Sequence, residues 1–243
     1  MNPSQNLGKT NCNPNVENQS ESKKKGLPDN YRPSLEEAKR YIKIWDSLPN
    51  YLAHENSLTS IFRGDESPYR ENRELRDIIL KVSVLNDFYS TNIYRVYQVA
   101  EKIKSIEDFD ERLSNGDLSL VDDFQEIEYQ GSQNEVKHKR NYSFATKYCS
   151  HHQPDKFPIY DSYVEKVLCD LKSQYPCKFS FHKKDLRNYK TYVKQLDILV
   201  EEFGLQELNY KMLDRYLWQL GKRYFAKYKD AVNGEIDYAK FGL

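Results

Sequence analysis

Apolar residues recur at helical spacing along most of this chain. Between residues 34 and 224 they return every three or four positions, which is the period of one face of an α-helix. No segment of comparable length alternates strictly between apolar and polar residues, as a half-buried strand would. Nine glycines and nine prolines in 243 residues are few for a turn-dense sandwich or barrel. The chain is therefore predicted to be all-α, with short connections between helices.

Capping residues and prolines set the expected helix boundaries. Ser34 and Glu37 form a capping box for a helix that ends at Pro49. A second helix covers residues 75–82, its pattern breaks at residues 86–89, and Ser90 or Thr91 begins the next. Short helices and a turn at 115–116 are expected up to residue 128, while residues 129–140 are polar and indicate no particular element. Later helices are expected at 141–150, from 161 or 162 to 171, at 192–203 and at 213–224.

Residues 1–30 are expected to be a disordered tail ahead of one helical region, residues 31–243. Seven asparagines and the run Lys23-Lys24-Lys25 occur there with scarcely any apolar residue, so the segment has little to bury. Such a tail adds weak electrostatic affinity for nucleic acid.

Charge is balanced overall but unevenly placed. The chain has 37 basic and 37 acidic residues, so its net charge indicates no partner. Nine acidic residues and one arginine lie between 107 and 128, whereas five basic residues and one acid lie between 137 and 156. The second segment is either a local site for a phosphate backbone or an ordinary solvated surface.

The cysteines indicate neither a metal site nor a disulfide framework. Cys12, Cys149, Cys169 and Cys177 form no CxxC pair and no closely spaced iron–sulfur loop. No apolar run approaches the length of a membrane span, and no signal-peptide core is present. We expect a reduced, soluble, cytoplasmic monomer without metal or cofactor.

Asp161 is the residue that most suggests chemistry. It follows the run Phe157-Pro158-Ile159-Tyr160 and opens a predicted helix. The free N–H groups and the dipole at a helix start stabilise a carboxylate anion. Asp161 is therefore either a simple N-cap or a reactive carboxylate held in place by its helix.

The segment from Asn141 to Leu168 resembles part of the helix–hairpin–helix (HhH-GPD) DNA glycosylase superfamily. In that family a hairpin's second helix is followed by a loop, a hydrophobic-Pro-hydrophobic run and a catalytic aspartate that opens the next helix, which would be Asp161 here. Residues 75–93, interrupted at 86–90, resemble the family's helix, wedge loop and helix. The two matches cover residues 72–170, the expected glycosylase-like core.

The resemblance implies a DNA glycosylase that flips a damaged or modified base out of double-stranded DNA and hydrolyses its N-glycosidic bond. Asp161 would stabilise the sugar cation and orient the attacking water. Similar divergent glycosylase-like proteins occur in bacterial defence against phages with modified bases. The family's Gly-rich hairpin turn is absent: only Gly131 is near, and Lys137, Lys139 and Arg140 occupy the region. These cations either replace the backbone–phosphate contact or mark a scaffold that no longer binds DNA.

The resemblance also assigns roles to other residues. Ser143 stands where bifunctional members have a nucleophilic lysine; Lys147 lies one turn later on the same face, either as a phosphate contact or as a Schiff-base nucleophile. Base release without strand cleavage is therefore expected. DNA contacts are assigned to Lys137, Lys139, Arg140, Ser143, His152, Asn86 and Phe88, and a base pocket to Tyr89, Tyr148 and Tyr160.

Each of these assignments has a plainer alternative. Residues 86–89 also fit a helix corner, and His152 also fits loop packing. Trp218 falls on an apolar face and is expected in the core, and Gly221 in the same helix allows a close helix approach. For the whole chain, the alternatives are a non-catalytic nucleic-acid-binding module on the same scaffold and a helical protein-interaction factor.

Overall fold

The protein is helical, as predicted. A computed structural model describes residues 26–226 and 236–243, and in that part of the chain ten α-helices accompany a single two-stranded sheet. Most of the expected tail lies outside the described residues. Its last part is not a tail, because Leu27 is buried and its N–H donates to Asp170 Oδ2 at 2.9 Å.

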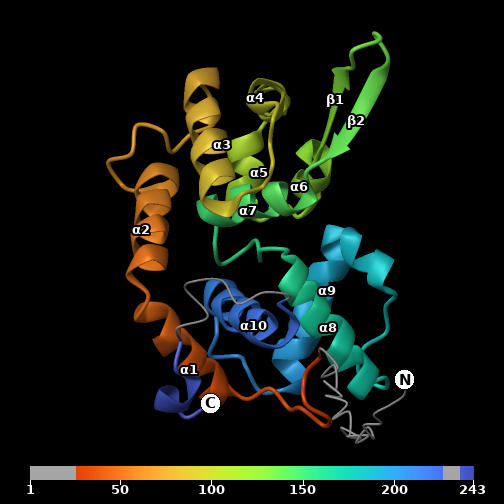
Figure 1. Ribbon diagram of the computed structural model, residues 1–243. Coiled ribbons are helices and arrows are strands. Elements are labelled where there is room, and N and C mark those ends of the chain that lie inside the picture. The colour runs from red at the N-terminus through yellow and green to blue at the C-terminus, as the bar shows by residue number, and fades with distance from the viewer. Residues whose placement is uncertain (1–25, 227–235) are drawn as a thin grey trace, which may run out of the picture.

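The helices form two groups joined along one side (Figure 1). The first group contains α3 (Leu75–Tyr89), α4 (Val96–Lys104), α5 (Phe109–Asn115), α6 (Ser119–Phe124) and α7 (Tyr142–His152). The second contains α1 (Leu35–Asp46), α8 (Ser162–Gln174), α9 (Tyr189–Glu202) and α10 (Tyr210–Phe225). Helix α2 (Pro49–Arg63) runs from the second group to the first, and 3₁₀ turns occupy Lys183–Arg187 and Tyr238–Phe241.

The N-terminal helix belongs to the C-terminal group. Helix α1 packs on α10, where Tyr41 and Tyr216 are fully buried with ring centroids 5.6 Å apart. Gln219 donates to the Tyr41 carbonyl at 2.9 Å, and the Tyr216 hydroxyl donates to Glu37 at 2.8 Å. Helices α1 and α10, which lie far apart in the sequence, are thus held together.

Helices α8 and α10 approach closely because one position carries no side chain. A Cβ on Gly221 would lie 2.7 Å from the Cβ and 2.8 Å from the carbonyl oxygen of Tyr163. The predicted close approach at Gly221 is confirmed.

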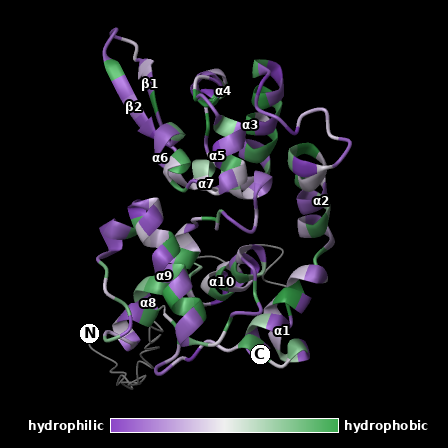
Figure 2. Cartoon of the chain, turned by 180° about the vertical axis from the view of Figure 1, so that it is seen from behind, coloured by the Kyte–Doolittle hydropathy of each residue, from purple (hydrophilic) through white to green (hydrophobic). Residues whose placement is uncertain are grey.

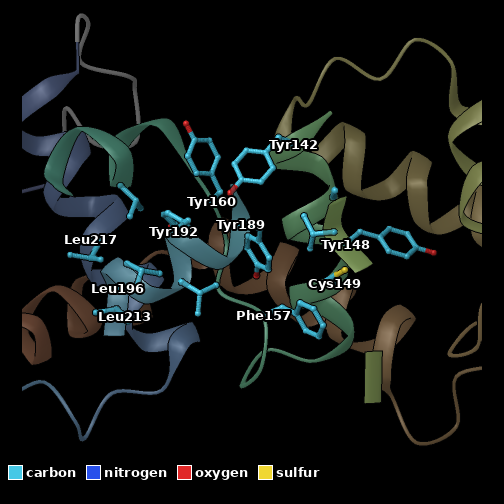
Figure 3. Packing of buried hydrophobic residues seen from close by; sticks show 14 of the residues in the cluster. Tyr142, Tyr148, Cys149, Phe157, Tyr160, Tyr189, Tyr192, Leu196, Leu213 and Leu217 are labelled. Carbon is cyan, nitrogen blue, oxygen red and sulfur yellow. The ribbon is translucent and has the colours of Figure 1, made fainter. Parts of the chain in front are cut away.

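One core runs through both groups. Its middle is a cluster of buried tyrosines from α7, α9 and the 157–161 connection, seen in Figure 3: Tyr142, Tyr148, Tyr160, Tyr189 and Tyr192. Hydrophobic and hydrophilic residues share the surface of most helices in Figure 2, in keeping with their amphipathic sequences.

The polar segment that indicated no element is a β-hairpin. Strand β1 (Glu126–Gln130) pairs antiparallel with β2 (Val136–Arg140), with Glu126 opposite Arg140 and Gln130 opposite Val136. The hairpin projects from the first group (Figure 1), and only Ile127 in it is buried. With both faces largely in solvent, the strands have no apolar alternation by which they are recognised.

Two predicted boundaries were wrong, and one helix was not predicted. Residues 86–89 continue α3, which ends at Ser90 in the left-handed region (φ 47°), and α4 begins only at Val96. The first helix ends at Asp46, just before Pro49, and Pro49 opens α2, which the sequence pattern did not indicate. A proline ring fits the first turn of a helix as well as it breaks the middle of one.

Candidate active site

Asp161 is the N-cap of α8. Its Oδ1 accepts from the Tyr163 N–H at 2.8 Å, and its side chain is 21% exposed. Ser162 and Glu165 have the spacing of a capping box but do not form one, because Asp161 is the N-cap. Glu165 instead accepts from the Tyr160 hydroxyl and pairs with Lys183 at 3.2 Å, so its carboxylate is used elsewhere.

Helices α7 and α9 fix the run that leads to Asp161. The Tyr189 and Tyr192 hydroxyls donate to the carbonyls of Pro158 and Ile159 at 2.8 and 2.6 Å. The Tyr160 N–H donates to Thr146 Oγ1 at 3.0 Å. These hydrogen bonds hold the backbone of the buried run and with it the position of the following carboxylate.

Lys147 lies beside Asp161. The Lys147 Nζ is 3.8 Å from Asp161 Oδ2 and donates to Ser143 Oγ at 2.6 Å and to the Tyr160 carbonyl at 3.4 Å. Ser143 and Lys147 share one face of α7, as their spacing predicted. Only 4% of Lys147 is exposed, and burial lowers the pKa of its amine, although Asp161 and Asp214 oppose that shift.

Two hollows meet at this pair. The inner pocket, a cavity of about 280 Å³, lies between the two helix groups, and the outer hollow, of about 420 Å³, lies beside the start of α7. Both are lined by Tyr89, Ser90, Lys147 and Asp161. Lys147 and Asp161 therefore form part of the wall between the two hollows.

Aromatic rings form much of the inner pocket. Trp45 and Tyr51 stack with centroids 4.9 Å apart, and the Trp218 ring meets both edge-on at 5.7 and 5.5 Å. His54 and Phe88 also line the pocket, and their rings stack with centroids 4.3 Å apart and nearly parallel planes. Rings of this kind provide flat apolar surfaces for a planar heterocycle.

The inner pocket also holds two carboxylates with different surroundings, Glu55 and Asp214. Glu55 accepts from Arg215 at 2.6 Å and from the Trp45 indole at 3.1 Å. Asp214, by contrast, makes no hydrogen bond or ion pair with any described residue. Burial raises the pKa of Asp214 to about 6, although Lys211 and Lys147 oppose the shift.

Basic side chains surround the outer hollow. Lys139, Arg140 and Arg187 line it together with Asn141, which precedes the first turn of α7. The Arg140 guanidinium donates to Gln125 Oε1 and to the Arg187 carbonyl, both at 2.6 Å. A helix start flanked by cations is a favourable place for an anion.

Some predicted site residues lie outside both hollows. Tyr148 follows Lys147 by one position, about 100° around the helix, so it points into the core and donates to Asn72 at 2.6 Å; its expected place in a base pocket is wrong. His152 is buried 3.4 Å from Lys81, and burial lowers its pKa. Asn86 accepts from the Ile93 N–H at 2.8 Å and supports the turn after α3. Lys137 lies on the hairpin, paired with Glu135 at 2.6 Å.

The other predicted residues line the hollows. Phe88 lies in the inner pocket, Tyr89 lines both spaces, and Ser143 and Tyr160 line the outer one. The Tyr89 hydroxyl is 3.0 Å from His151 Nε2, and the Lys147 amine lies 5.2 Å from the centre of its ring.

The sequence pattern did not indicate half of the inner pocket. Trp218 was expected in the core, but it lines the pocket with Lys211, Asp214 and Lys222 of the same helix. These positions follow the helical period, so a stripe of charged residues around one tryptophan was visible. From the sequence alone, this stripe looks the same as a solvated helix face. It becomes part of a pocket only because α2 packs opposite it and supplies Tyr51, His54 and Glu55.

Across residues 26–226 and 236–243, no three His, Cys, Asp or Glu side chains come together as a metal site would require. Over the same ranges, the helices are all too short or too polar to cross a bilayer.

Comparison with known proteins places the chain in a family. The model of the HI_0787 N-terminal domain matches residues 37–156, which include Lys147 but end before Asp161. A Haemophilus influenzae protein, whose description is "Uncharacterized protein", is 45% identical over 157 residues, or 64% of this chain and 72% of the relative. The chain belongs to the family of this Haemophilus protein. No solved structure matches this chain.

Proposed function

We propose that this protein is a DNA glycosylase that releases a damaged or modified base from double-stranded DNA. The observation that carries the proposal is the Lys147–Asp161 pair on the wall shared by an aromatic pocket and a cationic hollow. A flipped nucleotide needs such an arrangement: a flat apolar space for the base, cations for the flanking phosphates, and a carboxylate where the glycosidic bond lies between them.

In this mechanism the base enters the inner pocket and its sugar stays at the shared wall. The bond between C1′ and the base nitrogen breaks, and its electron pair leaves with the base. Asp161 stabilises the cationic sugar and accepts a proton from the water that attacks C1′. The carboxylate needs no reorganisation, since α8 and the tyrosine-held run before it already fix its position.

The test is base release by wild type and by Asp161→Asn. Asparagine is also a good N-cap, so the variant keeps α8 while it loses the negative charge. We expect base release from modified-base duplexes or phage DNA to fall by about 100-fold or more, with DNA binding retained. Abasic sites are counted with an aldehyde-reactive probe. Asp155→Asn, at an exposed position in the loop before this run, is the matched control. Equal activity of wild type and Asp161→Asn would overturn the mechanism.

A second activity, strand cleavage, is favoured by the burial of Lys147. A phosphate-binding lysine needs to reach solvent, whereas this amine is buried with a lowered pKa, as a Schiff-base nucleophile requires. After base release, the amine would add to the C1′ aldehyde of the ring-opened abasic sugar and lose water to form an imine. Removal of the C2′ proton would then expel the 3′ phosphate and break the strand. Borohydride trapping distinguishes the two activities: a covalent adduct absent in Lys147→Met establishes strand cleavage, and base release without an adduct establishes hydrolysis alone.

A further inference from the structure

The β1–β2 hairpin has two chemically different faces. Residues opposite each other in the register share a face, and successive residues alternate between faces. One face carries Glu126 and Glu128 with His138, whose Nδ1 is 3.1 Å from Glu126. The strand residues of the other face are Ile127, Tyr129, Lys137 and Lys139, with no acid among them.

The second face continues onto the loop after α3. Lys139 donates to the Asn92 carbonyl and lies 4.9 Å from the centre of the Tyr94 ring. The Arg95 guanidinium lies 3.8 Å from the centre of the Tyr129 ring. We call this surface, formed by Tyr94, Arg95, Tyr129, Lys137 and Lys139, the hairpin face.

The hairpin face exposes most of one aromatic ring, that of Tyr94, to solvent. Tyr94 is 83% exposed, the largest exposed fraction among the large hydrophobic residues left exposed in the described chain. Most other tyrosines of the chain are buried or half-buried. An exposed aromatic beside cations is typical of a surface that stacks bases and contacts phosphates.

The hairpin face is also continuous with the proposed active site. Lys139 belongs to it and lines the outer hollow with Lys147 and Asp161. Strand β2 then leads through Arg140 directly into α7. A strand of DNA whose flipped nucleotide occupies the inner pocket therefore has a path from the outer hollow onto this surface.

We propose that the hairpin face binds the DNA strand that flanks the flipped nucleotide. Lys137, Lys139 and Arg95 contact phosphates, and Tyr94 stacks on a base or sugar next to the target. This inference rests on the proposed function for its choice of ligand, and it assigns to side chains of a hairpin the contact that a Gly-rich turn would make through its backbone.

The experiment is fluorescence anisotropy with a short labelled duplex that carries one tetrahydrofuran abasic analogue. Lys137→Glu and the milder Lys137→Gln are compared with Lys39→Glu, a matched control in α1. Lys137 and Lys39 are similarly exposed (47% and 50%), and each pairs with a glutamate. We expect Lys137→Glu to weaken binding by roughly three- to tenfold and to lower the slope of log affinity against log salt by about 1. Lys39→Glu should bind as wild type.

Tyr94 is tested in the same assay. Loss of stacking in Tyr94→Ala should weaken binding by about fivefold or more, while Tyr94→Phe, which keeps the ring, should bind as wild type. Wild-type affinity and salt slope in both Lys137 variants and Tyr94→Ala would overturn the proposal, as would absence of binding by the intact protein at low salt. Binding that depends on these residues without any base release would instead overturn the proposed function alone.

Discussion

Asp214 shows how a single residue can oppose stability and serve a site. It lies in the inner pocket without a hydrogen bond among the described residues, one turn before Trp218 on α10. A carboxylate partly removed from water, with no hydrogen bond to replace that contact, costs free energy in the folded state. An arrangement of this kind is typical of a group kept for a ligand.

We predict that Asp214→Asn stabilises the protein near pH 7.5. The pKa of Asp214 rises from 3.8 to about 6 on folding, so its favourable contribution is present below the unfolded pKa and is lost as the pH rises through the folded one. The neutral amide avoids that loss, and the free energy of unfolding should increase by about 1–3 kcal/mol. Urea unfolding at pH 7.5 and at pH 5 measures the effect, which should shrink at the lower pH.

The same variant should release base more slowly if Asp214 contacts the base. Asp155→Asn, exposed in a loop, should change neither property. A variant that is less stable than wild type at pH 7.5 would mean that Asp214 has a stabilising partner, contrary to its position here.

At the scale of elements, the contact between α8 and α10 aligns the site. Helix α8 carries Asp161 at its start, and α10 carries Asp214 and Trp218. Their separation is set where Gly221 faces Tyr163, because no other residue leaves room there. The distance between Asp161 and the pocket residues of α10 therefore depends on Gly221, which lies far from Asp161 in the sequence.

Gly221→Ala should destabilise the protein by about 1–3 kcal/mol, because the new methyl overlaps backbone that cannot move aside. The gain in helix propensity, up to about 1 kcal/mol, is smaller than this overlap. Thermal unfolding followed by circular dichroism measures it, with Ser173→Ala on the exposed side of α8 as control. A variant as stable as wild type would show that the two helices separate freely.

At the scale of the whole molecule, the inner pocket is built by both helix groups. Phe88 and Lys147 come from the first, Trp45, Asp214 and Trp218 from the second, and α2 passes between them (Figure 1). A ligand seated in it contacts both groups and binds only the folded arrangement.

Abasic DNA should therefore raise the unfolding temperature. At a concentration 100-fold above the dissociation constant, the stabilisation is about 2.7 kcal/mol, which corresponds to an increase on the order of 5–10 °C for a chain of this size. A thermal-shift experiment compares a duplex carrying the tetrahydrofuran analogue with an unmodified duplex. Equal shifts with the two duplexes would argue against recognition of an extruded nucleotide.

The sequence by itself determined the helical class, the cap at Asp161 and the shared face of Ser143 and Lys147. These are local properties, because helix periodicity, capping and i,i+4 spacing depend on residues within one or two turns. The close approach at Gly221 was also indicated, since a glycine inside an apolar helix face has few other uses.

Only the tertiary structure decided the pocket and the hairpin. Trp218 was expected in the core and Tyr148 in a base pocket, yet Trp218 lines the inner pocket and Tyr148 is buried, because the outcome depends on which helix packs against each. The hairpin carries no apolar alternation, because most of its residues face solvent and not another part of the protein. The side-by-side position of Lys147 and Asp161 arises from two tyrosines of α9 that hold the connecting run, and contacts between segments so far apart leave no periodic trace in the sequence.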